Sequence, residues 1–255
     1  MRKVNKAIKK SAAMFFFLTI LTFSVYCADD VRSKPDLYFL KIDEVADSYK
    51  YLPPPPEMDS ISFLNDKAQY DKGKLLRKTA RGAQAYKDAG VTGDGLAQIF
   101  SESFGVQISR EATPEIYKLL QNMSADAGDL ATRSAKEAYM RTRPFAFFSE
   151  PTCRPEDEAI LSKNGSYPSG HTSIGWAEAL VLAEINPARQ NEILIRGYEV
   201  GESRVICGYH WQSDVDAGRL TAAAVEARLH ADLKFQKQLS KAKKEFSKIN
   251  AKKKN

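Results

Sequence analysis

The chain has 255 residues, of which 43% are hydrophobic and 27% are charged, and its formal net charge is +6. This length suits one large domain with a sizeable core, so two domains are not required. The chain contains only three histidines and three cysteines, too few ligands of the right type for a zinc site.

Residues 1–27 have the layout of a secretory signal peptide. They hold five basic residues, then an apolar run from Ala12 to Tyr26, and no acidic residue. The run is shorter than the roughly 20 apolar residues that span a membrane. We therefore expect cleavage, which leaves a domain at 28–255 with no stable membrane anchor. A lipoprotein signal centred on Cys27 is the alternative, but the neighbouring tyrosine is bulky where that signal needs a small residue.

A Lys-rich C-terminal tail at about 231–255 carries nine lysines. Loss of the five basic residues of the signal peptide lowers the formal charge from +6 to +1, so the precursor charge says little about partners. The tail could contact an anionic membrane or nucleic acid. We interpret it instead as the solvated face of a frayed terminal helix, because no nucleic-acid-binding motif accompanies it.

The mature chain starts with a polar segment that runs into four prolines at 53–56. Such a run is stiff and extended, and it is incompatible with the interior of a helix. We expect a lead-in arm packed against the domain, although a proline run can also bind an aromatic groove on a partner.

Beyond the arm, apolar residues recur at helical spacing and no stretch alternates like a strand. The helical stretches are at about 60–88, 94–103, 113–143, 171–185, 188–206 and 211–249. Glycines and prolines separate them. The pattern predicts an all-α fold, a single-domain helical bundle, with its longest loop at 145–170.

Three separated segments carry residues suited to chemistry on phosphate. Lys136 and Arg143 are seven residues apart, which places both cations on one face of the predicted helix. Arginine adds a fork geometry that matches phosphate oxygens. Taken alone, such a basic pair is typical of a solvated surface.

The second segment is Gly-Ser-Tyr-Pro-Ser-Gly-His-Thr at 165–172, where turn residues lead into an amphipathic helix. Ser169 can cap the helix, and Gly170 lets the backbone approach a ligand closely. Free N–H groups at a helix start form an anion site. His171 would lie beside the anion, although an ordinary capping histidine is equally compatible with this segment.

The third segment is Ser-Arg-x5-His-x3-Asp, which contains Arg204, His210 and Asp214. If His210 opens or lies on a helix, Asp214 shares its face and can accept a hydrogen bond from one ring nitrogen. The other nitrogen then presents a lone pair to phosphorus. A buried His–Asp pair that only stabilises the fold is the alternative.

Together these patterns resemble the three-part signature of the superfamily of acid phosphatases, type-2 phosphatidate phosphatases and vanadium haloperoxidases. Similarity to the class A bacterial non-specific acid phosphatases extends to the Gly-Ser-Tyr-Pro-Ser-Gly-His-Thr run at 165–172, here called the glycine-rich motif. It extends also to the exported chain and to segments 35–56 and 126–148. The resemblance covers nearly the whole mature chain. It implies an α-helical bundle and frequent homo-oligomers.

The resemblance also implies a role for each signature residue. His210 would be the nucleophile, Asp214 its orienting partner and His171 the general acid. The phosphate would be bound by Lys136, Arg143, Ser169, Gly170 and Arg204. It implies a metal-independent enzyme without a cofactor that hydrolyses small phosphomonoesters, namely nucleotides, sugar phosphates and aryl phosphates. Transfer of the phosphoryl group to an alcohol is an expected side activity.

Competing functions within the superfamily are disfavoured by the chain itself. Haloperoxidases resemble much longer chains, and a lipid phosphatase would need several membrane spans. A binding protein without activity would be expected to have lost one of His171, His210 or Asp214. Cys153 and Cys207 remain after cleavage and are a disulfide candidate in an exported chain. We expect the bacterial periplasm, because a glycan on the Asn164 acceptor triplet would crowd the pocket.

Overall fold

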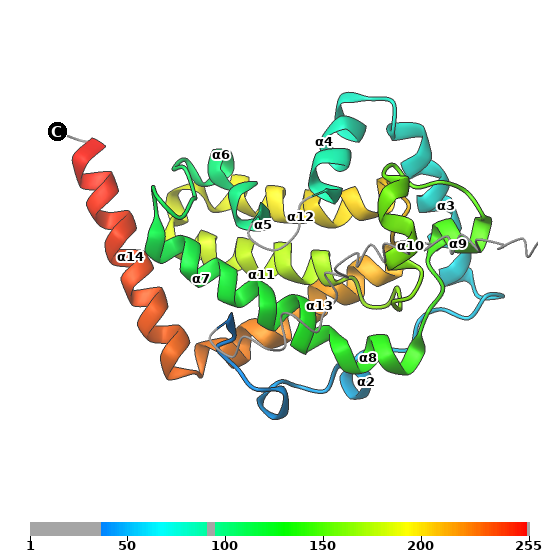
Figure 1. Ribbon diagram of the computed structural model, residues 1–255, viewed down its shortest axis with the longest axis horizontal. Helices are drawn as coiled ribbons and strands as arrows, with labels where there is room; N and C mark the ends of the chain where they lie inside the picture. Colours follow the sequence, from blue (N-terminus) through cyan, green and yellow to red (C-terminus); the bar gives the residue numbers. More distant parts are fainter. Residues whose placement is uncertain (1–36, 91–94, 254–255) are drawn as a thin grey trace, which may run out of the picture. The chain divides into compact units, whose positions relative to one another are not determined.

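The computed structural model describes residues 37–90 and 95–253, whose helices are shown in Figure 1. The described residues contain helices and no strand, which confirms the expected all-α fold. The expected signal peptide lies outside the described residues. The α-helices are α2 Ser48–Tyr51, α3 Ile61–Leu76, α4 Ala80–Ala89, α5 Gly95–Gln98, α6 Ser101–Phe104, α7 Pro114–Ala125, α8 Ala131–Tyr139, α9 Pro144–Phe148, α10 Glu158–Leu161, α11 Gly170–Ile185, α12 Gln190–Ile206, α13 Gln212–His230 and α14 Leu233–Lys253. Short 3₁₀ turns are η2 Ile42–Glu44, η4 Pro155–Asp157 and η5 Pro187–Arg189, and η3 Asp126–Leu130 is a π-helix.

The main core forms around α11, which packs against α12 and α13. This helix is rich in small and apolar residues, and nine of its sixteen residues are buried. Glycines allow close approach: an added Cβ at Gly175 would lie 2.7 Å from Val200, and one at Gly197 would lie 2.4 Å from Ala179. The contact fixes the depth of α11 against its neighbours, and thereby the position of its first turn.

Capping side chains interrupt two of the long stretches that the periodicity predicts. The stretch at 60–88 divides into α3 and α4 because the Thr79 hydroxyl accepts the Gly82 N–H at 3.3 Å. The stretch at 211–249 divides because Asp232 accepts the Phe235 N–H at 2.9 Å. Both residues are good helix N-caps, so a helix starts after each although the apolar pattern continues.

The N-terminal arm packs against the domain, as expected. The backbone N–H groups of Phe39 and Leu40 donate to the buried Asp126 carboxylate at 3.1 and 3.2 Å. Further along, the Tyr167 hydroxyl donates to the Pro53 carbonyl at 2.6 Å. The proline run forms one wall of a groove of about 620 Å³, whose other walls come from α3 and α13.

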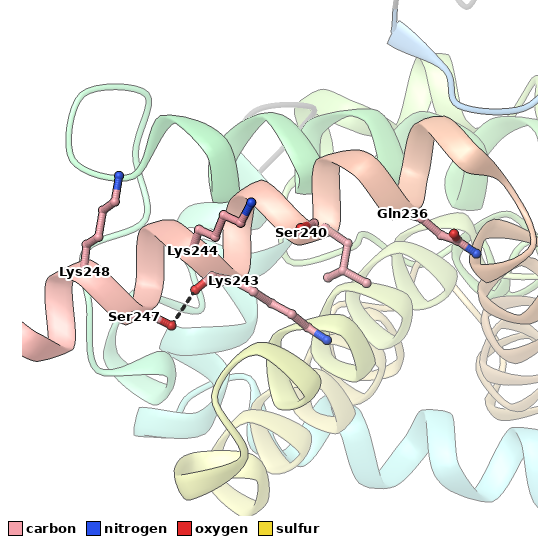
Figure 2. A pocket seen from close by; sticks show the side chains of 7 residues that line it. Gln236, Ser240, Lys243, Lys244, Ser247 and Lys248 are labelled. Carbon is pink, nitrogen blue, oxygen red and sulfur yellow. Dashed lines mark hydrogen bonds between the residues drawn. The ribbon is translucent and has the colours of Figure 1, made fainter.

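As far as the structure describes it, the Lys-rich tail is a packed helix, α14, and not a frayed one. In α14 the side chains of Phe235 and Phe246 are buried in the main core. The Glu245 carboxylate accepts the Ile116 N–H at 3.0 Å and so caps the start of α7. Figure 2 shows the lysines of the outer face, among them Lys243 and Lys248, along a shallow groove of about 530 Å³.

A disulfide joins the loop after α9 to the end of α12. It links Cys153 to Cys207, with the Cα atoms 4.7 Å apart. The Cys153 N–H also donates to the Cys207 carbonyl at 3.0 Å. Within the described residues, none of the helices combines the length and apolarity needed to cross a membrane.

Candidate active site

The sequence-predicted site residues lie at or beside the ends of five helices, which are labelled in Figure 1: α8, α9, α11, α12 and α13. Lys136 lies in the last turn of α8, Arg204 in the last turn of α12, and Asp214 in the first turn of α13. The other members follow: Arg143 before α9, Ser169, Gly170 and His171 at the start of α11, and His210 between α12 and α13. Arg143, Lys136, Arg204 and His171 all act electrostatically on the His210 ring, and Ser169 N–H donates to the Asp214 carbonyl at 2.9 Å.

His210 and Asp214 form a buried pair. Their side chains are 3% and 0% exposed, and Asp214 Oδ2 lies 3.3 Å from His210 Nδ1. The same oxygen accepts the Trp211 N–H at 2.8 Å. His210 does not lie in a helix, which corrects the expectation of a shared helical face. Instead the carboxylate reaches back from the first turn of α13, so one group both caps the helix and faces the imidazole.

Arg143 determines which nitrogen of His210 carries the lone pair. Its Nη1 atom lies 3.0 Å from Nε2. Because a guanidinium can only donate, Nε2 must accept, and the neutral ring carries its proton on Nδ1, facing Asp214. Burial first, and then the charges of Arg143 and Lys136, lower the pKa of His210 well below its ordinary value. His210 is therefore a neutral imidazole with its lone pair on Nε2.

Two arginines are held in a nearly dry site. Burial lowers the pKa of Arg143 to about 10, and burial followed by repulsion from Arg143 lowers the pKa of Arg204 to about 9. The Arg204 guanidinium lies 4.3 Å from the centre of the Tyr209 ring. Its Nε atom is buried with no hydrogen-bond partner among the described residues. Neither guanidinium has a carboxylate salt bridge within the part of the chain that the structure describes. Buried cations of this kind are costly, so the site is built for an anion.

Lys136 provides a third cation beside the glycine-rich motif. Its ammonium donates to the Gly165 carbonyl at 2.8 Å. Burial, followed by the charge of Arg143, lowers the pKa of Lys136 well below its ordinary value. An added Cβ at Gly165 would lie 2.5 Å from the Lys136 carbonyl oxygen, so only glycine lets the motif lie this close to α8.

The first turn of α11 provides the helix N-terminus that the motif predicts. The Ser169 hydroxyl accepts the Thr172 hydroxyl at 2.8 Å and its N–H at 3.4 Å. An added Cβ at Gly170 would lie 3.1 Å from the Gly128 carbonyl, so Gly170 serves a tight contact with η3 as well as the helix start. The half-buried His171 is the second residue of the helix. The positive end of the α11 dipole thus lies in the site.

Lys136 and Arg143 come together by a route that the helical spacing does not predict. The helix ends at Tyr139, and Met140 has a positive φ of 40°. Arg143 is extended, with φ −74° and ψ 153°, because the following Pro144 excludes helical geometry. The two cations therefore do not share a helix face. A turn brings Arg143 back toward the end of α8.

The sequence interpretation missed three side chains that belong to the surroundings of Asp214. The Ser166 hydroxyl donates to Asp214 Oδ2 at 2.5 Å and lies 3.3 Å from His210 Nδ1. Arg141 donates to Asp214 Oδ1 at 2.5 Å and to Asp66 at 2.7 Å. Ser166 stands inside the glycine-rich motif, so its position could have been noticed. Nothing in the local sequence marks Asp66, which lies in α3.

A separate group of possible metal ligands lies near the opposite end of α11 from His171. Among the described residues, Glu184, Glu226 and His230 place one ligand atom each within 4.8 Å of one another. The His230 Nε2 atom lies 3.1 Å from Glu226 and 3.2 Å from Glu184. The Lys243 ammonium lies 2.7 Å from Glu184. The Glu184 carboxylate thus has a cationic partner on α14.

Comparison with known proteins places the site in a wider context. The family model described as the PAP2 superfamily matches residues 120–237, which include all eight predicted site residues. A non-specific acid phosphatase of Providencia stuartii is 60% identical over 246 residues, 95% of this chain and 99% of the relative. One from Salmonella typhimurium is 46% identical over 94% of each chain. An acid phosphatase of Zymomonas mobilis is 36% identical over 80% of this chain and 76% of its own.

Proposed function

Since this chain belongs to the non-specific acid phosphatases of the PAP2 superfamily, we propose that it hydrolyses phosphate monoesters through a phosphohistidine formed on His210. The membership itself confirms the family resemblance seen in the sequence. One observation carries the proposed mechanism. The Nε2 lone pair of a buried, neutral His210 faces Arg143, 3.0 Å away, in a site that holds two further cations.

The phosphate group docks among Lys136, Arg143 and Arg204. These cations neutralise the charge on the phosphoryl oxygens and favour the transition state in which that charge spreads over them. The N–H groups at the start of α11, beyond Ser169, contribute partial positive charge. When phosphate binds, the Nη1–H group of Arg143 exchanges its hydrogen bond to His210 Nε2 for one to a phosphoryl oxygen. This exchange frees the lone pair only when substrate is present.

The first chemical step forms a bond between His210 Nε2 and phosphorus while the bond from phosphorus to the ester oxygen breaks. Protonated His171 transfers its proton to that oxygen, so the alcohol leaves neutral. The ring, now phosphorylated and still protonated on Nδ1, is positive, and the Asp214 carboxylate stabilises it. Water then attacks phosphorus, His171 takes its proton, and the phosphorus–nitrogen bond breaks to release phosphate and neutral His210.

The proposal includes a broad range of small phosphomonoesters and a transfer side activity. All of the proposed binding groups contact the phosphate, so nucleotides, sugar phosphates and aryl phosphates share the determinants that matter. An alcohol in place of water in the second step would receive the phosphoryl group. Since the cations of Lys136, Arg143 and Arg204 supply the charge that a metal would otherwise bring, we propose that the reaction proceeds without one.

Export to the periplasm is proposed on the basic and apolar pattern of residues 1–27 and supported by the disulfide between Cys153 and Cys207. Disulfides persist in oxidising compartments and are rare in the cytosol. Fractionation of an expressing bacterium would place the activity in the periplasmic fraction, and N-terminal sequencing would find a chain that begins near residue 28. An uncleaved chain in the membrane fraction would contradict this proposal.

The mechanism is tested by phosphate release from p-nitrophenyl phosphate at about pH 6, the protonated range of imidazole, in the presence of EDTA. We expect the wild type to be active and His210→Ala to lose at least about 10³-fold in kcat. His230→Ala is the matched control, because that histidine lies at the end of α13, among the carboxylates of Glu184 and Glu226. It should keep wild-type turnover.

A labelled intermediate provides the second measurement. Rapid quenching of the wild type with radiolabelled substrate should trap phosphate in an acid-labile, base-stable bond, which is typical of phosphohistidine, and His210→Ala should trap none. Loss of activity on EDTA treatment would contradict the metal-free mechanism. A fully active His210→Ala variant would exclude the phosphohistidine route.

A further inference from the structure

Asp214 is surrounded by more donors than an orienting carboxylate needs. Its Oδ2 atom accepts from Ser166 Oγ at 2.5 Å and from Trp211 N–H at 2.8 Å, and it faces His210 at 3.3 Å. Its Oδ1 atom accepts from Arg141 Nη1 at 2.5 Å. Each oxygen is therefore held from a fixed direction, and rotation of the carboxylate would break several hydrogen bonds at once.

Arg141 is in turn held by a second buried carboxylate, on α3. The Asp66 side chain is 1% exposed, and its Oδ2 atom accepts from Arg141 Nη2 at 2.7 Å. Ser213 also holds Asp66 in place, because its N–H and its hydroxyl both donate to the Asp66 carboxylate, at 2.8 and 2.6 Å. The Arg141 guanidinium also lies 5.5 Å from the Trp211 ring centre. Its planar fork thus bridges two carboxylates that come from different helices.

These groups form a row of alternating charge that ends at His210. Asp66 is negative, Arg141 positive and Asp214 negative, and the imidazole changes from neutral to positive when Nε2 bonds to phosphorus. Without Asp66, the positive charge of Arg141 would offset part of the Asp214 charge that stabilises the ring. Asp66 cancels this opposition, so the Asp214 charge acts on the ring nearly undiminished in a site where water screens little.

We propose that Asp66 and Arg141 are positioning residues for the His210 nucleophile, acting through Asp214 without contacting the substrate. This inference rests on the phosphohistidine mechanism proposed above. Asp66 balances the charge of Arg141, and Arg141 holds the Asp214 carboxylate against His210 Nδ1. The pair stabilises the positive phosphohistidine ring, and therefore the chemical step, and leaves the binding of the phosphate group unchanged.

The variant Asp66→Asn keeps the shape and removes the charge. We expect kcat on p-nitrophenyl phosphate to fall about tenfold, a change equivalent to about 1.4 kcal/mol in the barrier. KM, and the dissociation constant of inorganic phosphate measured by calorimetry, should stay within about twofold of wild type. Asp126→Asn is the matched control: it alters another buried aspartate, one that holds the N-terminal arm. Its turnover should equal that of wild type.

A double-mutant cycle tests whether Asp66 acts through Arg141. In the Arg141→Gln background, the further change Asp66→Asn should alter kcat by less than about twofold, because the charge that Asp66 balances is already gone. A tenfold loss in both backgrounds would overturn the proposal. So would a rise in KM or in the phosphate dissociation constant at constant kcat, or an equal loss in the Asp126→Asn control.

Two further measurements distinguish a failure of this inference from misfolding of a variant and from a failure of the phosphohistidine mechanism. Thermal unfolding and circular dichroism identify variants that fail to fold, and Arg141→Lys then replaces Asp66→Asn. Lysine keeps the charge but cannot bridge two carboxylates, so a tenfold loss in kcat at constant KM is expected again. An active wild type with Asp66→Asn and Arg141→Lys both at wild-type kcat overturns this inference alone. Equal activity of wild type and His210→Ala overturns the phosphohistidine mechanism instead.

Discussion

Two histidine–carboxylate pairs lie at the two ends of α13, and the pair that contains His210 lies among buried cations. His210 and Asp214 lie 3.3 Å apart with the imidazole 3% exposed, and His230 and Glu226 lie 3.1 Å apart with the imidazole 38% exposed. Both pairs are four residues apart in sequence. The first faces arginines and a lysine, whereas the second faces a further carboxylate, Glu184.

A carboxylate four residues away in sequence is therefore not enough to make a histidine a nucleophile. Burial and neighbouring cations keep His210 neutral. Because Arg143 can only donate to Nε2, the lone pair of the His210 ring is on that nitrogen. His230 lies between two carboxylates, and its imidazole is far more exposed than that of His210. The same pair of residue types therefore lies among cations at one end of α13 and among carboxylates at the other.

The largest effect on kcat is expected when the carboxylate beside His210, and not the one beside His230, is changed to an amide. Asp214→Asn should lower kcat by about 10³-fold, because an amide can donate to Nδ1 and so stabilise the wrong tautomer of His210. Glu226→Gln should change kcat by less than about twofold. The ¹⁵N spectrum of histidine-labelled protein, which contains only three histidines, reports the tautomer directly. A wild-type tautomer with full activity in Asp214→Asn would break the comparison.

The next effect concerns the cations around His210. Arg204→Lys keeps a charge but loses the planar fork, and we expect kcat/KM to fall by about 10²-fold, as for the loss of one transition-state donor. Arg228→Lys, toward the other end of α13, is the control and should leave kcat/KM unchanged. Steady-state kinetics on p-nitrophenyl phosphate measure both. Similar values for the two variants would mean that Arg204 does not contact the phosphoryl group.

Inorganic phosphate should stabilise the fold through the same cations, with a defined pH dependence. At ten times its dissociation constant, phosphate should add about 1.4 kcal/mol to the free energy of unfolding. Because the pKa of Arg204 is lowered to about 9 and that of Arg143 to about 10, both are charged below pH 8 and begin to lose their protons above about pH 9. The stabilisation should therefore shrink in alkali, and the loss begins earlier because burial also lowers the pKa of Lys136.

Thermal unfolding with phosphate, and with chloride at equal ionic strength as the control, measures this effect. The shift should persist in Glu226→Gln, since the His230 end does not bind the anion. A phosphate effect that grows above pH 9, or that disappears in Glu226→Gln, would place the anion at the other end of α13.

The smallest effect belongs to Glu178, which lies in α11 between its two ends. Burial raises the pKa of Glu178 to about 8, although a hydrogen bond from Ser124 at 2.7 Å favours the charged form. The unfolded chain loses this proton near pH 4.5, so between that value and about pH 8 the folded state binds one proton more and stability falls as pH rises.

Glu178→Gln removes this titration. Between about pH 6.5 and 7.5 the loss of unfolding free energy should be smaller in the variant by about 1 kcal/mol, the value of one proton over one pH unit. Urea unfolding at each pH gives the comparison, with the exposed Glu192→Gln as the control. Equal slopes in Glu178→Gln and wild type would show that this carboxyl group is already ionised in the fold.

Most of the candidate site follows from the sequence, because its residues stand in short motifs. The N-cap, the glycine and His171 share one segment, and Arg204, His210 and Asp214 share another. Local chemistry is enough there: a serine before a helix caps it, and an aspartate near a helix start can reach back to a residue just before it. The helical periodicity is likewise enough for an all-α fold, since it depends only on which residues are apolar.

The remainder depends on contacts between distant parts of the chain. The break after Tyr139 and the extended Arg143 bring two cations together by a turn and not by helical spacing. Asp66 reaches the site only because α3 packs beside α13, and 147 residues separate it from Ser213. The sequence by itself determined which groups could perform the chemistry. Tertiary packing decided their protonation and direction, because burial and neighbouring charge, which set both, arise only when the helix ends converge.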